Sequence, residues 1–253
     1  MALLEVRNLS KYFGGFAAIR KLTLDIHDGE IIGLIGPNGS GKSTLFNVIS
    51  GYYRASEGRI EFHGKDITAL KTHRIAQMGI GRSFQASTLF MGSTVFENIL
   101  TSFHLNFREP EWKTFLRTPA AIKDENKIKG DVMELIKFVG LSPHKDKLAS
   151  ELSSGFQKAL AICIALATKP KLLLLDEPAT TLSPDKVDMI MALVKKVRAA
   201  GTTVVIIEHN MRAIMDHCDR IVVLAYGEKI ADGLPQEIRE NRQVIEAYLG
   251  AMG

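Results

Sequence analysis

The stretch 31-IIGLIGPNGSGKST-44 decides how the rest of the chain is interpreted. A short apolar run ends at Ile35, and a glycine-rich loop then leads into Lys42 and Ser43. Glycine permits backbone conformations that aim successive N–H groups at one point, and a helix starting near Lys42 adds its positive end. The spacing Gly36-x-x-x-x-Gly41-Lys42-Ser43 therefore predicts a phosphate-binding loop that holds a triphosphate.

Within this loop, two side chains have predicted roles of their own. Lys42 is expected to neutralise the β and γ phosphates, and the Ser43 hydroxyl is expected to ligate Mg²⁺. A glycine-rich turn that binds nothing is the alternative, and the strand before the loop and the helix after it argue against that alternative. The residues expected to contact the nucleotide are Gly36, Pro37, Asn38, Gly39, Ser40, Gly41, Lys42, Ser43 and Thr44.

Length and composition exclude several classes of protein. The chain has 253 residues, 46% of them hydrophobic, which is enough for one larger domain or two small lobes. No apolar run reaches the roughly 20 residues needed to cross a bilayer. Glu5 and Arg7 stand where a signal peptide would have its apolar region, so we expect a cytoplasmic protein.

The net charge is +4, and the Lys and Arg residues are scattered along the sequence, so no nucleic-acid partner is expected. Cys163 and Cys218 are expected to be buried free thiols.

Strand and helix patterns alternate along most of the chain. Continuous apolar runs at 172–175 and 204–207 predict strands buried on both faces of a parallel sheet. Hairpins are predicted at 58–67 and 220–233, and the patterns turn helical after residue 94. The expected fold is α/β, with a mixed sheet core, an antiparallel β edge and a mostly helical subdomain.

Two further strand ends carry candidate catalytic groups. Asp176 ends the apolar run "KLLLLDEP", where a carboxylate is costly unless it meets a cation, and Mg²⁺ held between Ser43 and Asp176 would supply one. Glu177 is placed to polarise an attacking water. His209 follows the run "VVIIEH" and is expected beside the γ-phosphate.

The segment Leu152-Ser153-Ser154-Gly155 opens a predicted helix and forms a second cradle for phosphate oxygens. One ATP does not need two cradles in one chain. A head-to-tail pair of chains is therefore predicted, in which the serine–glycine turn of each chain covers the phosphate loop of the other. ATP binding then closes the pair and hydrolysis releases it.

In this order, the phosphate loop, Gln85 after a strand, the Leu152–Gly155 turn, Asp176-Glu177 and His209 resemble the motifs of the ATP-binding subunits of ATP-binding-cassette (ABC) transporters. The resemblance covers nearly all 253 residues. It implies one nucleotide-binding domain, in which residues 1–94 and 166–253 form a RecA-like core with a β subdomain. Residues 95–165 would form the helical subdomain. It carries the Leu152–Gly155 turn, which is called the signature turn below.

The resemblance also implies roles for two residues outside the phosphate loop and the strand ends. Phe13 would stack on adenine, and Gln85 would join the Mg²⁺ and water site and link it to the membrane partner. Three segments are similar to sequences of the branched-chain amino-acid importer subfamily. They are residues 81–100, the stretch RTPA at 117–120 and the ending VIEAYLG at 244–250. The implied function is ATP hydrolysis that powers import of branched-chain amino acids or a similar small organic solute.

Implied partners are a second ATP-binding subunit, identical or paralogous, transmembrane permease subunits and, indirectly, a periplasmic or extracellular solute-binding protein. The implied place is peripheral, on the cytoplasmic face of the cell membrane. Two other uses of the fold stay open, namely a single-cassette ATPase of iron–sulfur assembly and a lipid exporter. A small-molecule kinase is disfavoured because the signature turn would then have no task.

Four residues depart from the family pattern: Phe156 stands in place of glutamine, Ala159 and Ile164 in place of arginines, and Ser183 in place of asparagine or aspartate. These departures bear on turnover and on dimer affinity. Restoring glutamine at Phe156 is expected to raise ATP turnover if the side chain faces the dimer interface. If Phe156 instead packs within its own lobe, the same change would destabilise the fold.

Overall fold

The computed structural model describes residues 2–83, 89–104 and 119–249, which form two compact units. Unit 1 comprises Met1–Arg82 and Pro170–Gly253, and unit 2 comprises Ser83–Lys169. Unit 2 is longer than the helical segment expected at 95–165. Local hydrogen bonds explain the difference, because the Phe90 N–H donates to Asn98 Oδ1 at 2.9 Å and the Ala149 N–H donates to Ser93 O at 2.9 Å. Residues 89–94 are thereby tied to the helices that follow.

A six-stranded sheet with the strand order β10-β9-β3-β8-β7-β6 organises unit 1. Its strands are β3 (Ile31–Ile35), β6 (Ile80–Ser83), β7 (Leu172–Asp176), β8 (Thr203–Ile207), β9 (Arg220–Ala225) and β10 (Glu228–Gly233). β3 runs parallel to β8 and β9, β7 runs parallel to β8, and β10 is antiparallel to β9. The predicted parallel core and the hairpin at 220–233 are confirmed.

Apolar contacts cover both faces of this sheet. The helices of unit 1 are α1 (Lys42–Ile49), α2 (Thr72–Gln77), α7 (Pro184–Ala199), α8 (Met211–His217), α9 (Pro235–Glu240) and α10 (Arg242–Leu249). On one face, Val205 belongs to the same buried cluster as Phe46 of α1. On the other face, a Cβ at Gly33 of β3 would lie 2.7 Å from Ile214 of α8. This double burial accounts for the continuous apolar runs.

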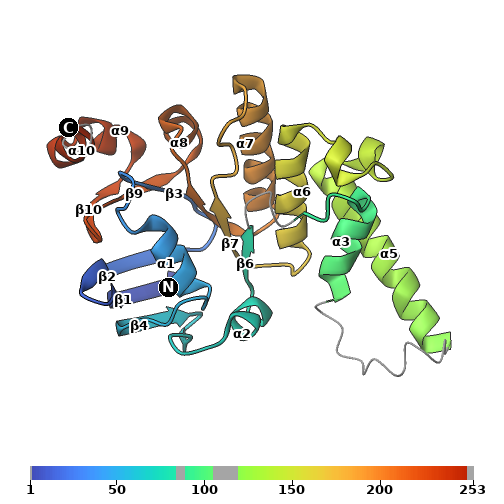
Figure 1. Cartoon of the computed structure of the whole chain (residues 1–253), viewed down its shortest axis with the longest axis horizontal. Coiled ribbons are helices and arrows are strands. Elements are labelled where there is room, and N and C mark those ends of the chain that lie inside the picture. The colour runs from blue at the N-terminus through green and yellow to red at the C-terminus, as the bar shows by residue number, and fades with distance from the viewer. Residues whose placement is uncertain (1, 84–88, 105–118, 250–253) are drawn as a thin grey trace. The chain divides into compact units, whose positions relative to one another are not determined.

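The second sheet of unit 1 has four antiparallel strands in the order β2-β1-β4-β5. They are β1 (Ala2–Phe13), β2 (Phe16–His27), β4 (Glu57–Phe62) and β5 (Lys65–Asp66), so the hairpin expected at 58–67 is confirmed. Figure 1 shows α1 lying between the two sheets, and the shared buried cluster contains Leu4 of β1, Phe46 of α1 and Leu34 of β3. The phosphate-loop helix is therefore enclosed by apolar side chains from both sheets.

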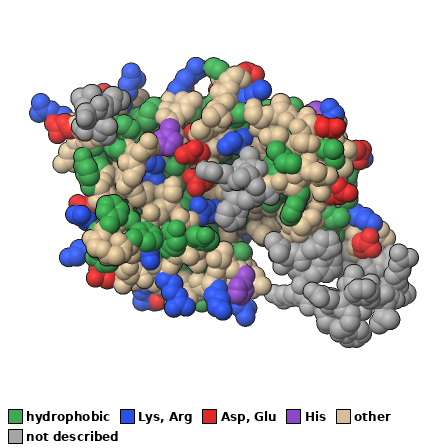
Figure 2. All heavy atoms as spheres, in the orientation of Figure 1, with side chains coloured by type: hydrophobic (Ala, Val, Ile, Leu, Met, Phe, Trp, Pro, Cys, Tyr) green, Lys and Arg blue, Asp and Glu red, His purple; other side chains and the backbone are tan. Residues whose placement is uncertain are grey.

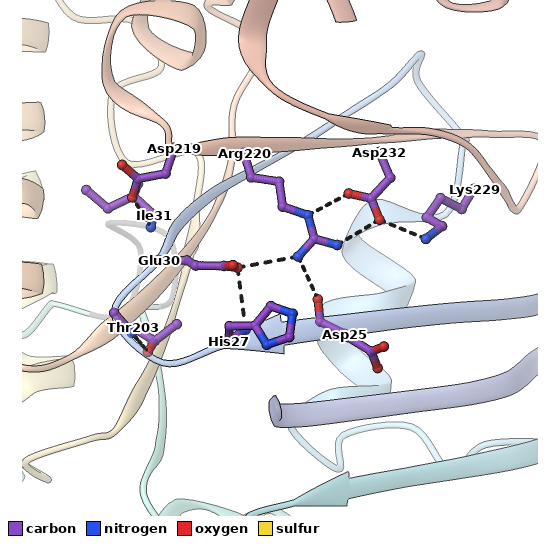
Figure 3. Close-up of polar contacts among 10 residues, drawn as sticks. Asp25, His27, Glu30, Ile31, Thr203, Asp219, Arg220, Lys229 and Asp232 are labelled. Atoms are coloured by element: carbon purple, nitrogen blue, oxygen red, sulfur yellow. Dashed lines mark hydrogen bonds and ion pairs between the residues drawn. The ribbon is translucent and has the colours of Figure 1, made fainter. Parts of the chain in front are cut away.

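A polar cluster at the start of β9 joins the same two sheets (Figure 3). Arg220 donates from Nε to Asp232 Oδ1 at 2.6 Å and from Nη2 to Oδ2 at 2.8 Å, while Nη1 donates to the backbone oxygen of Asp25 in β2 at 3.0 Å. Lys229 also donates to Asp232, at 2.8 Å. Burial alone would raise the pKa of Asp232, but the hydrogen bonds from Arg220 and Lys229 lower it below its usual value.

Unit 2 is built from α3 (Val95–His104), α5 (Pro119–Val139), the short 3-10 turns η2 (Ser142–His144) and η3 (Ala149–Glu151), and α6 (Ser154–Leu166). The three α-helices contact one another. Their inward faces carry side chains at 0% exposure: Val95, Ile99, Val132, Ile136 and Leu160. The helical subdomain expected from the sequence is therefore present as a packed bundle.

Other expectations concern burial and charge. Cys163 and Cys218 are free and buried, as predicted. Over residues 2–83, 89–104 and 119–249, no helix combines the length and apolarity that a membrane span requires. On the face drawn in Figure 2, Lys and Arg side chains are dispersed among acidic and apolar ones instead of forming one block.

Candidate functional site

The phosphate loop connects β3 to α1 and is shaped by its glycines. Three of them have positive φ: Gly36 at 148°, Gly39 at 76° and Gly41 at 104°. A Cβ at Gly36 would lie 2.0 Å from the backbone oxygen of Leu224, and one at Gly41 would lie 2.5 Å from that of Ala18. Both the backbone conformation and the close approach of neighbouring strands therefore require glycine at these two positions.

Lys42 opens α1 and lies over the loop. Its side chain is 6% exposed, and Nζ donates to the backbone oxygens of Gly36 at 2.7 Å and of Pro37 at 2.9 Å. Burial lowers the pKa of Lys42, and the nearby carboxylates of Glu177 and Asp176 act against that change. The predicted phosphate-binding lysine and the two predicted carboxylates are thus brought to one place.

Glu177 and His209 leave neighbouring strands and meet. The Glu177 N–H donates to the Ile207 oxygen at 2.9 Å, which fixes the residue after β7 against the end of β8. His209 Nε2 lies 3.1 Å from Glu177 Oε1, within hydrogen-bond distance. Because parallel strands end at the same edge of a sheet, this pair lies on the edge from which the phosphate loop also leaves.

Asp176 has an ion-pair partner that the sequence did not suggest. Arg82 of β6 donates from Nη2 to Asp176 Oδ2 at 3.2 Å, and each side chain is 12% exposed. Its Nη1 also donates to Asn47 Oδ1 at 2.7 Å and to Ser50 Oγ at 3.2 Å, both on or next to α1. Arg82 stands in the segment "GRSFQ"; the buried carboxylate of Asp176 signalled that a cation lies nearby, which the sequence predicted to be Mg²⁺, but nothing in the sequence indicated Arg82.

The residues predicted to hold Mg²⁺ offer a hydroxyl and a carboxylate, from Ser43 and Asp176. Within the described ranges, no group of three or more His, Cys, Asp or Glu side chains gathers as a metal cage. Mg²⁺ is commonly bound by one or two protein oxygens together with substrate phosphates and water, so this sparse donor set fits. Gln85, the third predicted ligand, lies outside the described residues.

Phe13 lies at the turn between β1 and β2 and is 41% exposed. Its ring contacts Tyr53 edge to face at 5.1 Å, and Lys11 Nζ lies 5.0 Å from the ring centroid. In Figure 2, apolar side chains gather over this end of β1 and β2. Because β2 also touches the phosphate loop through Ala18 and Gly41, an exposed aromatic face is available near that loop.

The signature turn belongs to unit 2. Ser153 and Ser154 are exposed and Gly155 is buried, with Ser153 at the N-cap of α6 in an extended conformation. Their contact with a phosphate loop of another chain stays a prediction.

The departures from the family pattern have definite surroundings. The Phe156 ring is half-buried and contacts the His144 ring at 4.4 Å between centroids, which supports the packing alternative. Ala159 is buried and Ile164 is half-buried on α6, and Ser183 occupies the N-cap position of α7.

Tyr248 of α10 was quoted in the sequence only as part of a family-like ending. Burial raises the pKa of Tyr248, and the nearby Gly36 backbone acts in the opposite direction. The electrostatics of Tyr248 therefore place it near the first residue of the phosphate loop. A long-range contact of this kind carries no sequence signal.

Comparisons with known proteins agree with these motifs. A family profile described as "ABC transporter" matches residues 19–180, and one described as "Branched-chain amino acid ATP-binding cassette transporter" matches residues 228–252. The high-affinity branched-chain amino acid transport ATP-binding protein BraF of Pseudomonas aeruginosa is 37% identical over 249 residues, which cover 98% of each chain.

Solved structures show the same fold. The ADP conformation of an ATP-binding cassette of an ABC transporter is 34% identical, has a TM-score of 0.87 and covers 99% of each chain. A dimeric, post-hydrolysis cassette bound to ADP and phosphate is 26% identical, with a TM-score of 0.76 over 92% of this chain and 98% of that one. The predicted α/β cassette fold is therefore confirmed.

Proposed function

The chain belongs to the ATP-binding proteins of the ABC transporter family, and on that premise we propose that it powers import of branched-chain amino acids or a similar small organic solute. Members of this family bind ATP and are ATPases coupled to transport. The profile match at residues 228–252 and the name of the Pseudomonas relative support the choice of solute.

One observation carries the catalytic part of the proposal, namely the buried Lys42 beside the Glu177–His209 pair. Lys42 and the loop N–H groups hold the β and γ phosphates, exchanging the carbonyl oxygens of Gly36 and Pro37 for phosphate oxygens. Glu177 polarises the attacking water, whose oxygen bonds to the γ-phosphorus as the bond from that phosphorus to the ADP oxygen breaks, which yields inorganic phosphate and ADP. His209 orients Glu177 and contacts the γ-phosphate.

Mg²⁺, bound by Ser43, Asp176 and Gln85, would neutralise charge on the phosphate oxygens. Phe13 stacks on adenine, for which its exposed face near the loop is suited. The loop residues 36–44 supply the remaining nucleotide contacts.

We further propose that two cassettes, identical or paralogous, close head to tail on ATP. Ser153, Ser154 and Gly155 of unit 2 then cover the phosphate loop of the second chain. The dimeric cassette among the similar structures supports this arrangement. In the assembled transporter, the pair lies peripherally on the cytoplasmic face of the membrane beneath permease subunits, and a solute-binding protein delivers the solute from outside.

Two measurements test this proposal. In cells that lack the gene, uptake of labelled leucine, isoleucine and valine should fall and should return with the parent gene. A gene carrying Glu177→Gln should not restore uptake, whereas the exposed control Glu228→Gln should restore it. If uptake of these amino acids does not depend on the gene, the proposed choice of solute is refuted. Hydrolysis by purified Glu177→Gln within about threefold of the parent would refute the assigned catalytic group.

A further inference from the structure

Glu208 is a buried carboxylate at the end of β8, immediately before His209. Its exposure is 2%. One oxygen accepts the Ala179 N–H, and the other accepts the Thr180 hydroxyl at 3.3 Å and the His209 N–H at 3.2 Å. Within the part of the chain that the structure describes, it has no ion-pair partner. The carboxylate is therefore held by hydrogen bonds to the loop after Glu177 and to the residue beside it.

The 177–181 loop, which donates hydrogen bonds to Glu208, has an unfavourable backbone conformation at both ends. Glu177 has φ 52° and Thr181 has φ 68°, in the left-handed region that favours glycine. A β-branched threonine is especially disfavoured there. Strained conformations persist only where surrounding contacts fix them. The two loop residues that donate to Glu208, Ala179 and Thr180, lie between these strained positions.

We propose that Glu208 is a positioning residue for ATP hydrolysis, which holds the strained 177–181 loop so that Glu177 stays against His209. The inference rests on the proposed function, since it takes Glu177 and His209 as the hydrolytic pair. The geometry is direct, because Ala179 is two residues beyond Glu177 and His209 is the next residue after Glu208. One side chain thus fixes both members of the pair through short backbone connections.

Glu208 itself is unsuited to polarise water. Both of its oxygens accept hydrogen bonds from the protein, and it is almost fully buried. The Glu177 side chain, by contrast, is 30% exposed. A different reading is that Glu208 only contributes to folding stability. The two roles can be told apart by a substitution, Thr181→Gly, that relieves the backbone strain of the loop without restoring the Glu208 carboxylate.

Glu208→Gln should lower kcat about tenfold, the scale of one lost hydrogen bond, with the KM for ATP within about twofold of the parent. Thr180→Val, which keeps the side-chain shape and removes only the hydroxyl, should lower kcat about threefold. Adding Thr181→Gly to Glu208→Gln should return kcat to within about threefold of the parent, because glycine adopts positive φ without strain. Glu237→Gln is the matched control, since Glu237 accepts the Leu234 N–H at 2.8 Å on α9, outside this loop.

A second readout is independent of hydrolysis. Hydrogen–deuterium exchange of the 177–183 peptide should be faster in Glu208→Gln than in the parent and unchanged in Glu237→Gln. Unchanged exchange, or parental kcat in both Glu208→Gln and Thr180→Val, would overturn the inference. A fall in kcat that Thr181→Gly does not rescue would also overturn it. If Glu177→Gln hydrolysed ATP normally, the catalytic role assigned to Glu177 in the proposed function would fail, while the exchange data would still report whether Glu208 holds the loop.

Discussion

Replacing Arg82 by methionine should lower the free energy of unfolding by about 3 kcal/mol. Removing one partner of a buried ion pair costs about 3–5 kcal/mol, because the other charge is left without compensation. We take the lower end since Arg82 and Asp176 each keep 12% exposure. The hydrogen bonds from Arg82 to Asn47 and Ser50 are lost as well, but they belong to the same guanidinium and do not add in full.

The assay is urea unfolding of the nucleotide-free chain, with two comparison variants. Arg74→Met removes an exposed arginine of α2 and should change stability by no more than about 0.5 kcal/mol. The double variant Arg82→Met/Asp176→Asn should recover most of the loss, because no charge is then buried alone.

Two results would refute this reasoning. The first is Arg82→Met with a stability within about 1 kcal/mol of the parent, which would mean that water already compensates Asp176. The second is a double variant no more stable than Arg82→Met, which would attribute the loss to packing instead of charge.

Three other substitutions are informative. Lys42→Ala should remove most ATP affinity, because it deletes the cation facing the β and γ phosphates; fluorescent ATP titration within about threefold of the parent would contradict this. Phe156→Gln should lower the melting temperature without raising ATP turnover, because the ring contact with His144 is worth about 0.5–1.5 kcal/mol; faster turnover with unchanged melting would favour an interface role. Asp232→Asn should cost more stability at pH 7 than at pH 3, since a lowered carboxyl pKa stabilises the fold fully above the unfolded value of about 3.9 and that stabilisation is lost as pH falls from there through the folded pKa. An equal loss at both pH values in urea unfolding would show that the charge of Asp232 is not responsible.

Short-range patterns predicted much of the fold and the centre of the site. The spacing from Gly36 to Ser43 predicted a loop between a strand and a helix, and the run ending at Asp176 predicted a buried strand. Both follow from local backbone chemistry and from apolar periodicity, which a single sequence displays. The approach of Glu177 to His209 was also predictable, because neighbouring parallel strands end at one edge.

The features that the sequence did not predict are contacts between side chains far apart in the chain. Nothing in the sequence near Arg82 indicates that it would reach Asp176, which lies 94 positions later in the chain. Glu208 could have been noticed by the argument applied to Asp176, since both are carboxylates at the ends of buried strands. Its partners could not, because Ala179 and Thr180 offer a backbone N–H and a hydroxyl that every loop contains.

The position of Tyr248 near Gly36 has a practical consequence for handling the protein. Residues 228–252 match the profile described as "Branched-chain amino acid ATP-binding cassette transporter", while Gly36 belongs to the general phosphate-loop motif. A residue of the segment that matches the branched-chain profile thus lies near the nucleotide-binding loop. An affinity tag fused after residue 253 would follow α10 closely in the sequence, so nucleotide affinities should be measured after the tag has been removed.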